Sequence, residues 1–282
     1  MSFFEFLSSL FASLFDPSHP SAGISGAPGG DYRIYNDKNS IYDVSTVDTK
    51  ASAPPGWEGD PPYRYLDVSR YQGKITLDGW RKVKAAGYKG VMLKTVSTNR
   101  KLSKRADGLY IDPTFEDNYC NAKAAGLDVG VYYYTYAISR TGADKELALL
   151  AEALRGKELT LPVAVDVEDN KLKQLGKQAL TDLTAYALAR IEAMGFYAQL
   201  YTYTSFANSR LYMGGAALKP YDVWLADYTG KAPKVSFKYN VHQHTSKGSV
   251  PGINGPVDLN VTTINYLRII RKKGLTRLRE GA

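Results

Sequence analysis

The segment LPVAVDVE, residues 161–168, has the clearest strand pattern in the sequence. Side chains alternate between the two faces of a β-strand, so its three valines are expected on one face, packed against outer helices. Asp166 and Glu168 then share the opposite face with the alanine of the segment. The pattern predicts a strand that is apolar toward its covering helices and acidic on its other face.

Seven further runs have strand character from Tyr63 onward. They are YRYLDVS, GVMLKTV, VGVYYYTY, AQLYTY, DVWLADY, YNVHQHT and PVDLNV. Helical patterns separate the early runs, begin at capping residues and stop at glycines, with expected spans of 78–87, 112–126, 141–156 and 178–194. Alternating strands and helices predict parallel strands covered by helices, an α/β fold. The last three runs leave little room for helices, so we expect an irregular TIM-like barrel of about five β/α units plus three further β-strands.

Composition divides the chain into four expected regions. Residues 1–17 place apolar side chains at helical spacing and end at a proline, which predicts an amphipathic N-terminal helix. Residues 18–62 are rich in Gly, Pro, Ser and Asp and form a linker-rich extension. The barrel domain is expected over 63–267, and residues 268–282 form a basic C-terminal tail that is alternatively a solvated helix face.

The N-terminal helix has three interpretations. It docks on the protein's own body or a protein partner, lies on a membrane surface, or is an atypical export signal. Docking is favoured, because the stretch has no clear signal peptide: it lacks a positive start and carries Glu5 within the apolar run. It is also too short to span a bilayer as a helix.

Charge and cysteine content narrow the function classes. The net charge of +8 attracts nucleic acid, anionic membranes or anionic wall polymers, but no zinc-finger spacing or RNP motif accompanies it, so no specific nucleic acid is expected. Cys120 is the single cysteine of the sequence, which excludes an intrachain disulfide. The sequence has neither a P-loop nor a GxSxG motif, so nucleotide binding and serine-hydrolase chemistry are unsupported.

Carboxylates at strand ends carry the chemistry. Asp166 and Glu168 originate about 6–7 Å apart at a rise of ~3.3 Å per residue. Two like charges that close cannot both ionise easily, so one becomes a proton donor beside a charged carboxylate, as glycoside hydrolysis requires. The alternative, two solvated acids at a strand end, has equal weight from this strand alone. Asp67 and Asp258 also lie where strands meet loops, and they should be neighbours, since the first and last strands meet when a barrel closes.

An ordered set of short motifs extends this pattern from residue 65 to residue 260. The motifs are DVSRYQG at 67–73, AGY at 86–88, VMLK at 91–94, AAGL at 124–127, GVYYY at 130–134, DVE at 166–168, WLADY at 224–228, QHT at 243–245 and VDLN at 257–260. In this order they resemble the family-25 glycoside hydrolases, the N-acetylmuramidase lysozymes of phages, bacteria and fungi. The resemblance covers roughly two-thirds of the chain, and the order is more specific than any one motif.

The resemblance implies a function and a set of site residues. The implied reaction is cleavage of the β-1,4 bond between N-acetylmuramic acid and N-acetylglucosamine in bacterial peptidoglycan, with retained configuration, no cofactor and action at the bacterial cell wall. Glu168 would be the general acid, and Asp166 would orient the substrate's acetamido group or act as the nucleophile. Asp67 and Asp258 would line the floor of the site. The implied sugar-binding residues are Lys94, Tyr132, Tyr134, Trp224, Tyr228 and Gln243.

Several features depart from the family pattern or leave alternatives. Strand alternation does not settle which of the tyrosines 132–134 face inward, and residues 98–110, TNRKLSKRADGLY, form a long basic loop. His242 and His244 flank Gln243, but no third ligand is evident, so no metal is expected.

Two alternative functions remain open from the sequence. A chitinase-like glycosidase is one alternative, although the residues before Asp166 are apolar where chitinases carry further acids. The other is a barrel used as a tethered or structural wall-binding module of a larger particle.

Overall fold

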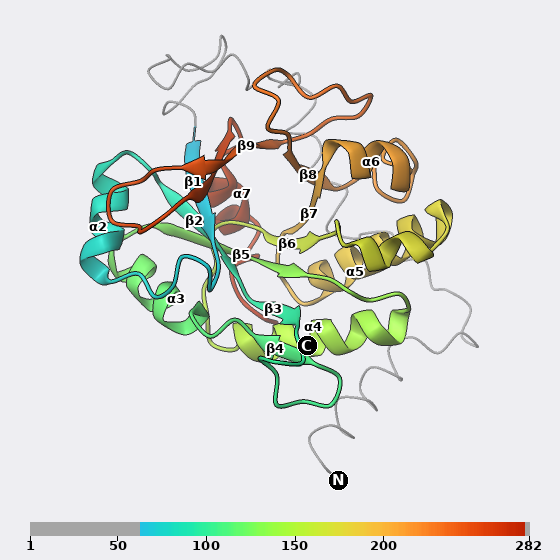
Figure 1. Ribbon diagram of the computed structural model, residues 1–282, viewed down its shortest axis with the longest axis horizontal. Coiled ribbons are helices and arrows are strands. Elements are labelled where there is room, and N and C mark those ends of the chain that lie inside the picture. The colour runs from blue at the N-terminus through green and yellow to red at the C-terminus, as the bar shows by residue number, and fades with distance from the viewer. Residues whose placement is uncertain (1–62, 280–282) are drawn as a thin grey trace.

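The computed structural model describes residues 63–279, so the expected N-terminal helix (1–17) and linker-rich extension (18–62) lie outside the described residues. Eight strands close into a barrel in the order β1-β10-β9-β8-β7-β6-β5-β2 (Figure 1). Their bounds are β1 (Tyr63–Val68), β2 (Gly90–Lys94), β5 (Asp128–Tyr134), β6 (Val163–Asp166), β7 (Ala198–Tyr203), β8 (Asp222–Ala226), β9 (Val241–Gly248) and β10 (Val257–Thr262). Each expected strand run forms one barrel strand, which confirms the irregular TIM-like α/β barrel.

The irregular part of the barrel is its last strand. Neighbouring strands from β1 round to β9 pair in parallel, whereas β10 is antiparallel to both β9 and β1. No helix separates β8, β9 and β10 in the described chain, as the short connections predicted. β9 and β10 are joined directly as an antiparallel pair, so β10 runs in the opposite direction, and this reversal brings the start of β10 to the open end of the barrel.

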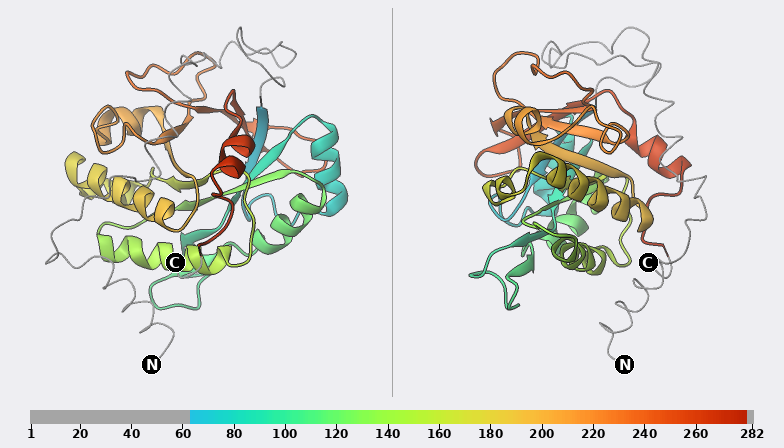
Figure 2. Two further views of the ribbon diagram at one scale, coloured as in Figure 1. Left: turned by 180° about the vertical axis from the view of Figure 1, so that it is seen from behind. Right: turned by 90° about the vertical axis from the view of Figure 1, so that its right-hand side faces the viewer.

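The four expected helices pack on the outside of the barrel and, within residues 63–279, leave the side formed by β8, β9 and β10 without a covering helix, as Figure 2 shows from two further directions. They are α2 (Leu77–Ala85), α3 (Phe115–Ala124), α4 (Arg140–Leu154) and α5 (Lys177–Ala193). The expected capping box at Thr141 is wrong: the N-cap of α4 is Ser139, whose hydroxyl accepts a hydrogen bond from the Gly142 amide at 3.2 Å. The helix therefore begins at Arg140, two residues earlier than a cap at Thr141 would give.

Some elements were not expected from the sequence. They are the hairpin of β3 (Val96–Thr98) and β4 (Leu109–Ile111), the 3₁₀ helix η3 (Asn170–Gln174), and the short helices α6 (Thr204–Arg210) and α7 (Tyr266–Lys272). The hairpin contains much of the basic loop that departs from the family pattern. These elements are too short for a clear hydrophobic period, which explains why pattern reasoning missed them. No helix in residues 63–279 has the length and apolar character needed to cross a membrane.

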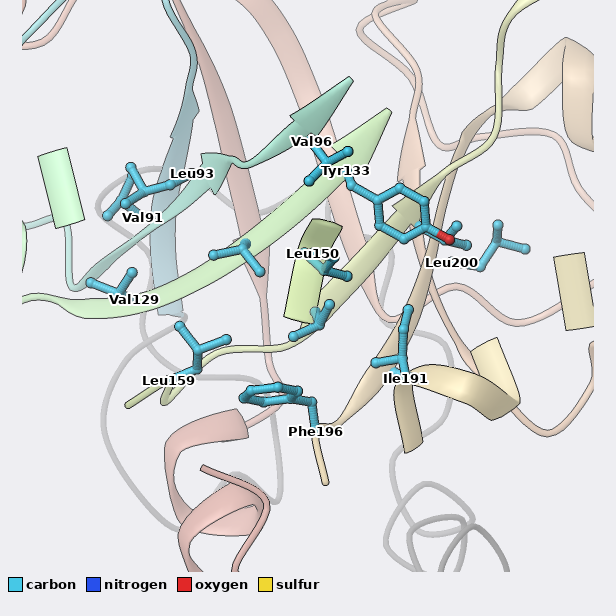
Figure 3. Close-up of a cluster of buried hydrophobic side chains, with 14 of the residues drawn as sticks. Val91, Leu93, Val96, Val129, Tyr133, Leu150, Leu159, Ile191, Phe196 and Leu200 are labelled. Atoms are coloured by element: carbon cyan, nitrogen blue, oxygen red, sulfur yellow. The ribbon is translucent and has the colours of Figure 1, made fainter. Parts of the chain in front are cut away.

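The hydrophobic core has two layers. The outer layer lies between strands and helices and includes the valines of residues 163–167, whereas Ala164 lies in the inner layer within the barrel. The expected alternation along this strand is therefore confirmed. Figure 3 shows Tyr133 in the outer layer with Leu150, Ile191 and Leu200, so of the tyrosines 132–134 the middle one faces outward.

Helix α7 packs at the amino-terminal end of the barrel strands. The Tyr266 hydroxyl donates to Asp222 at the start of β8, and Ile270 is fully buried. Beyond the helix, Thr276 forms a β-bridge with Phe196. The expected boundary between residues 267 and 268 falls within α7, and the arginines Arg268 and Arg271 lie on its exposed face.

Candidate active site

Four carboxyl groups gather at the open end of the barrel, where the parallel strands finish. Asp67 lies near the end of β1, Asp166 ends β6, and Asp258 lies near the start of β10. Glu168 follows β6 in a loop, and the intervening Val167 amide donates to the Tyr201 carbonyl at 2.9 Å. The charge of Glu168 raises the pKa of Asp166, and the charge of Asp258 raises the pKa of both Glu168 and Asp67. These four residues, which come from distant parts of the sequence, therefore form one cluster.

Asp67 is the buried centre of a hydrogen-bond network. Its Oδ2 accepts from Gln243 Nε2 at 2.8 Å and from Asn260 Nδ2 at 2.9 Å. Asp258 is its direct partner in the β1–β10 register, as barrel closure predicted. Burial, and then the charge of Asp258, raise the pKa of Asp67 well above its ordinary value. The pair therefore favours a state in which Asp67 keeps its proton and Asp258 is the more exposed carboxylate.

Asp166 and Glu168 form the second acidic pair. Asp166 is buried, and its Oδ1 has no hydrogen-bond partner in the described part of the chain. Burial, followed by the charge of Glu168, raises the pKa of Asp166 well above its ordinary value. Burial also raises the pKa of Glu168 to about 7, opposed by the nearby ammonium of Lys94. At neutral pH Glu168 is thus poised to give or take a proton.

Lys94 provides the positive charge of this cluster. It ends β2, and its Nζ lies 4.8 Å from the ring centroid of Tyr134 and 5.9 Å from that of Tyr132. Burial lowers the pKa of Lys94, while the charges of Asp166, Asp112 and Glu168 oppose this shift. The ammonium is held by aromatic faces next to the acids it stabilises.

Comparison with known proteins assigns this architecture to a family. Residues 66–253 match the model of the glycosyl hydrolases family 25. The chain belongs to this family. It is 31% identical over 196 residues to the autolytic lysozyme of Clostridium acetobutylicum, an alignment that covers 69% of this chain and 54% of the relative. The chain thus spans about half the length of that relative.

Solved structures share the family-25 fold. The bacterial lysozyme from Streptomyces coelicolor superimposes with a TM-score of 0.61 at 27% identity, covering 75% of this chain and 97% of that one. The autolysin LytC of Streptococcus pneumoniae, solved with a synthetic peptidoglycan ligand, gives a TM-score of 0.60 at 22% identity and covers 71% of this chain and 46% of its own. The second likeness is one of fold alone.

The aromatic residues implied by family 25 occupy two different depths. Tyr132 and Tyr134 are partly buried beside Lys94, and Tyr228 is 51% exposed at the rim. Trp224, by contrast, is only 1% exposed. Its Nε1 donates to Asn260 Oδ1 at 2.7 Å, so the indole lies beneath the mouth and supports the amide that holds Asp67.

Gln243 also lies beneath the open surface, at 2% exposure. Its Oε1 accepts from the hydroxyls of Tyr201 at 2.9 Å and Tyr228 at 2.6 Å, while its Nε2 donates to Asp67. All hydrogen-bonding directions of the side-chain oxygen and one of its amide donors are used within the protein. This arrangement differs from the direct sugar contact that the family resemblance implies.

Sequence reasoning missed several residues of this family-25 site. Tyr201 is buried, and its ring centroid lies 4.6 Å from that of Trp224. Tyr71 is exposed after β1, and the ring centroid of Tyr136 lies 5.0 Å from that of Tyr134. Tyr71 lies within the DVSRYQG motif, which could have identified it as a site residue. For Tyr136, the sequence offers no such indication beyond its position after a tyrosine-rich strand.

The two histidines near Gln243 have protein partners. The ring Nε2 of His242 lies 2.9 Å from the Asp227 carbonyl oxygen, and the rings of His242 and His244 lie 6.1 Å apart. No group of three or more His, Cys, Asp or Glu side chains is placed to hold a metal ion within residues 63–279.

Proposed function

We propose that this chain is a peptidoglycan hydrolase that cleaves the β-1,4 bond between N-acetylmuramic acid and N-acetylglucosamine. The observation that carries the proposal is Glu168, a carboxyl group with a pKa of about 7, placed beside Asp166 at the mouth of a family-25 barrel. The lysozyme name of the Clostridium relative and the peptidoglycan ligand of LytC support the substrate class. The proposed place of action is the bacterial cell wall.

Glu168 acts as the general acid in this scheme. Its raised pKa keeps a large fraction protonated near neutral pH, so it can protonate the departing glycosidic oxygen. As an oxocarbenium-like charge develops on the sugar, Asp166 stabilises it, through the substrate's acetamido group or by direct attack. Glu168, now deprotonated, then takes a proton from a water molecule whose oxygen attacks the anomeric carbon. This attack breaks the bond between that carbon and Asp166 or the acetamido oxygen, so the product keeps its configuration and both carboxyl groups return to their starting states.

Lys94 favours ionisation of the acidic pair. Its ammonium favours the ionised form of both Asp166 and Glu168, and for Glu168 it is the main influence that opposes burial. Replacing this charge would leave both carboxyls protonated over a wider pH range. Lys94 therefore lowers the pH at which the pair loses its first proton, so that one of the two carboxyl groups can be charged while the other holds a proton.

The remaining site residues divide into sugar contacts and supports. Tyr132, Tyr134 and Tyr228 present partly open rings, which suit the flat apolar faces of sugars. Trp224 and Gln243 support the acids from below through Asn260 and Asp67. Asp67 and Asp258 set the charge of the floor, as their paired register and shared burial support.

The substitution Glu168→Gln tests the proposal. It should lower the rate of clearing of a peptidoglycan suspension by at least ~100-fold, the scale of a lost general acid, while the thermal midpoint changes little. The matched control Glu152→Gln removes an exposed carboxylate on α4 and should leave clearing unchanged. Full activity in Glu168→Gln would overturn the assignment of the acid. Preferential cleavage of chitin oligomers by the unmodified chain would instead favour the chitinase-like alternative.

A further inference from the structure

A cavity lies on the outside of the barrel, lined by residues of α5, of α6 and of the loops that follow α6 and β8. α5 and α6 lie on the same side of the barrel and contact each other (Figure 1). Its volume is about 660 Å³, which falls within the usual range for small-ligand sites. The side chains that could contact a ligand are Lys177, Gln178, Asn208, Tyr212, Ser236 and Phe237. None of the four carboxylates at the barrel mouth lines this cavity, so it is separate from the proposed active site.

Tyr212 forms an exposed platform on its wall. It is 48% exposed, although its neighbours Leu211 and Met213 are buried. Its backbone amide donates to Thr181 Oγ1 of α5 at 3.0 Å, and its carbonyl accepts from the Gly215 amide at 3.0 Å. The backbone is thus anchored at the tyrosine, so less of the loop has to be ordered when a ligand binds the ring.

Lys177 braces this platform. Its Nζ lies 4.8 Å from the centroid of the Tyr212 ring and donates to the Asn208 carbonyl oxygen at 3.1 Å. The ammonium therefore joins α5, α6 and the tyrosine across the cavity. It has further N–H groups that a ligand oxygen could accept from.

Two side-chain amides supply unused acceptors. Gln178 Nε2 donates to Asp182 Oδ1 at 2.8 Å, and Asn208 Nδ2 donates to the Lys234 carbonyl at 3.3 Å. These bonds fix the amide planes, and the Oε1 and Oδ1 atoms have no hydrogen-bond partner within residues 63–279. A ligand rich in O–H and N–H donors would complement this lining.

We propose that the cavity is a second, noncatalytic site that binds an N-acetylated sugar unit of a wall glycan. An N-acetylhexosamine offers a flat apolar face for Tyr212, hydroxyl and amide donors for Gln178 and Asn208, and a methyl group for the ring of Phe237. The identity of the polymer rests on the proposed function, whereas the binding of an N-acetylated sugar here does not.

A second site changes how the enzyme holds an insoluble polymer. When one site holds a glycan, neighbouring units of the wall reach the other at high effective concentration, so a weak site strengthens attachment. The gain requires a polymer or network that reaches both sites. A short soluble substrate, which occupies the mouth alone, receives no benefit.

The first test measures binding without turnover, in the Glu168→Gln chain. Titration with the N-acetylglucosamine tetramer should shift amide NMR signals of α5 and α6 in addition to those at the barrel mouth. Tyr212→Ala in this background should abolish the α5–α6 shifts and keep those at the mouth. Tyr212→Phe retains the ring and should keep the shifts at α5–α6 and at the mouth. This result would show that the ring, and not the hydroxyl group, makes the contact with the sugar.

The second test measures attachment and turnover. In the otherwise unmodified chain, Tyr212→Ala should reduce co-sedimentation with insoluble peptidoglycan about tenfold, with hydrolysis of a soluble oligosaccharide unchanged. Tyr212→Phe should match the unmodified chain in both measurements.

Three outcomes would overturn the second site. They are shifts confined to the mouth, a loss of soluble-oligosaccharide hydrolysis in Tyr212→Ala as large as its loss of co-sedimentation, and α5–α6 shifts produced by a free stem peptide but not by the sugar. Failure of the proposed function looks different: the unmodified chain would bind the tetramer at α5–α6 and yet fail to clear walls.

Discussion

Asp67 and Asp258 lie directly opposite each other in the antiparallel pair of β1 and β10, although 191 positions separate them in the sequence. The pairing exists because β10 reverses direction and closes the barrel against the first strand. It places two acids side by side on the floor of the site, where burial raises the pKa of both carboxyl groups. Ionisation of these carboxyl groups therefore has an electrostatic cost in folding free energy, and this cost grows as pH rises.

Replacing Asp67 by Asn should remove this cost. A carboxyl group whose pKa is higher in the folded than in the unfolded chain binds more protons when folded, so stability falls as pH rises. Asp67→Asn keeps an oxygen to accept from Gln243 and Asn260 but carries no charge. We expect the thermal midpoint at pH 8 to rise by about 2–4 °C, the effect of ~1 kcal/mol in a domain of this size. Calorimetry at pH 4 and pH 8 checks it: an equal midpoint difference at both pH values would contradict the charge argument.

Replacing Lys94 by Met should move the alkaline limit of activity. The Lys94 ammonium lowers the pKa of Glu168, which is about 7, so its removal should raise that pKa. Glu168 would then stay protonated at higher pH, and the fall of kcat/KM on the alkaline side should shift upward from near pH 7. The maximal rate should drop by roughly tenfold or more, since Asp166 loses the charge that favours its ionised form.

Lys94→Arg serves as the matched control for this change. It keeps the positive charge above the tyrosine rings and should leave the alkaline limit close to its original position. Rate profiles from pH 4 to pH 9 with a soluble substrate measure both variants. An unchanged alkaline limit in Lys94→Met would show that the lysine does not influence the pKa of Glu168.

Gln243 should act as a positioning residue, because its side chain is buried and bonded to Asp67, Tyr201 and Tyr228. Gln243→Leu removes a donor from Asp67 and leaves the buried Tyr201 hydroxyl without its acceptor, which costs about 1–3 kcal/mol of stability. We expect kcat to fall about tenfold with KM little changed. Tyr228→Phe removes one bond to the same oxygen and should have a smaller effect on kcat.

A KM effect would point to a different role for Gln243. If Gln243→Leu raises KM tenfold and leaves kcat intact, the amide contacts sugar directly, as the family resemblance implied. Steady-state kinetics at several soluble substrate lengths separate the two results. The pH profile adds an independent readout, since loss of the donor should raise the pKa of Asp67 further.

Glu146 provides a test of buried charge away from the mouth. Its carboxyl oxygens accept from Thr135 Oγ1 at 2.6 Å and from the Tyr136 amide at 2.9 Å, and burial raises its pKa from 4.5 to about 7. The folded chain binds the extra proton, so stability is lost as pH rises from 4.5 to 7. Glu146→Gln resembles the protonated form and should be near neutral at pH 4, yet more stable than the unmodified chain at pH 8.

The expected gain from Glu146→Gln at pH 8 is on the order of 3 kcal/mol, from ~1.4 kcal/mol per pKa unit. Urea unfolding at both pH values gives the difference. Glu152→Gln, on the exposed face of the same helix, should show no such pH dependence. A constant difference between Glu146→Gln and the unmodified chain would show that the carboxyl ionises without cost.

Local patterns were sufficient for most of the framework. Alternation in residues 161–168 predicted the outward valines and the inward Asp166, and both predictions hold because strand geometry fixes side-chain direction. Glu168 shows the limit of this reasoning: β6 ends at Asp166, so the glutamate is directed by a loop and by the Val167 bond to Tyr201. The N-cap of α4, Ser139 in place of Thr141, shows that one cap can replace another within a single turn.

The number of barrel strands, their order along the chain, the resemblance to family 25 and the positions of the acids all follow from the sequence alone. Which of these residues are covered and which are open depends on the folded chain. Trp224, Gln243 and Tyr228 all belong to family-25 motifs, yet only Tyr228 reaches the surface. Burial of a side chain depends on strand register and on neighbours far away in the sequence. The register of β10 against β9 shifts between Val257 and Asn260, and no local period predicts such a shift.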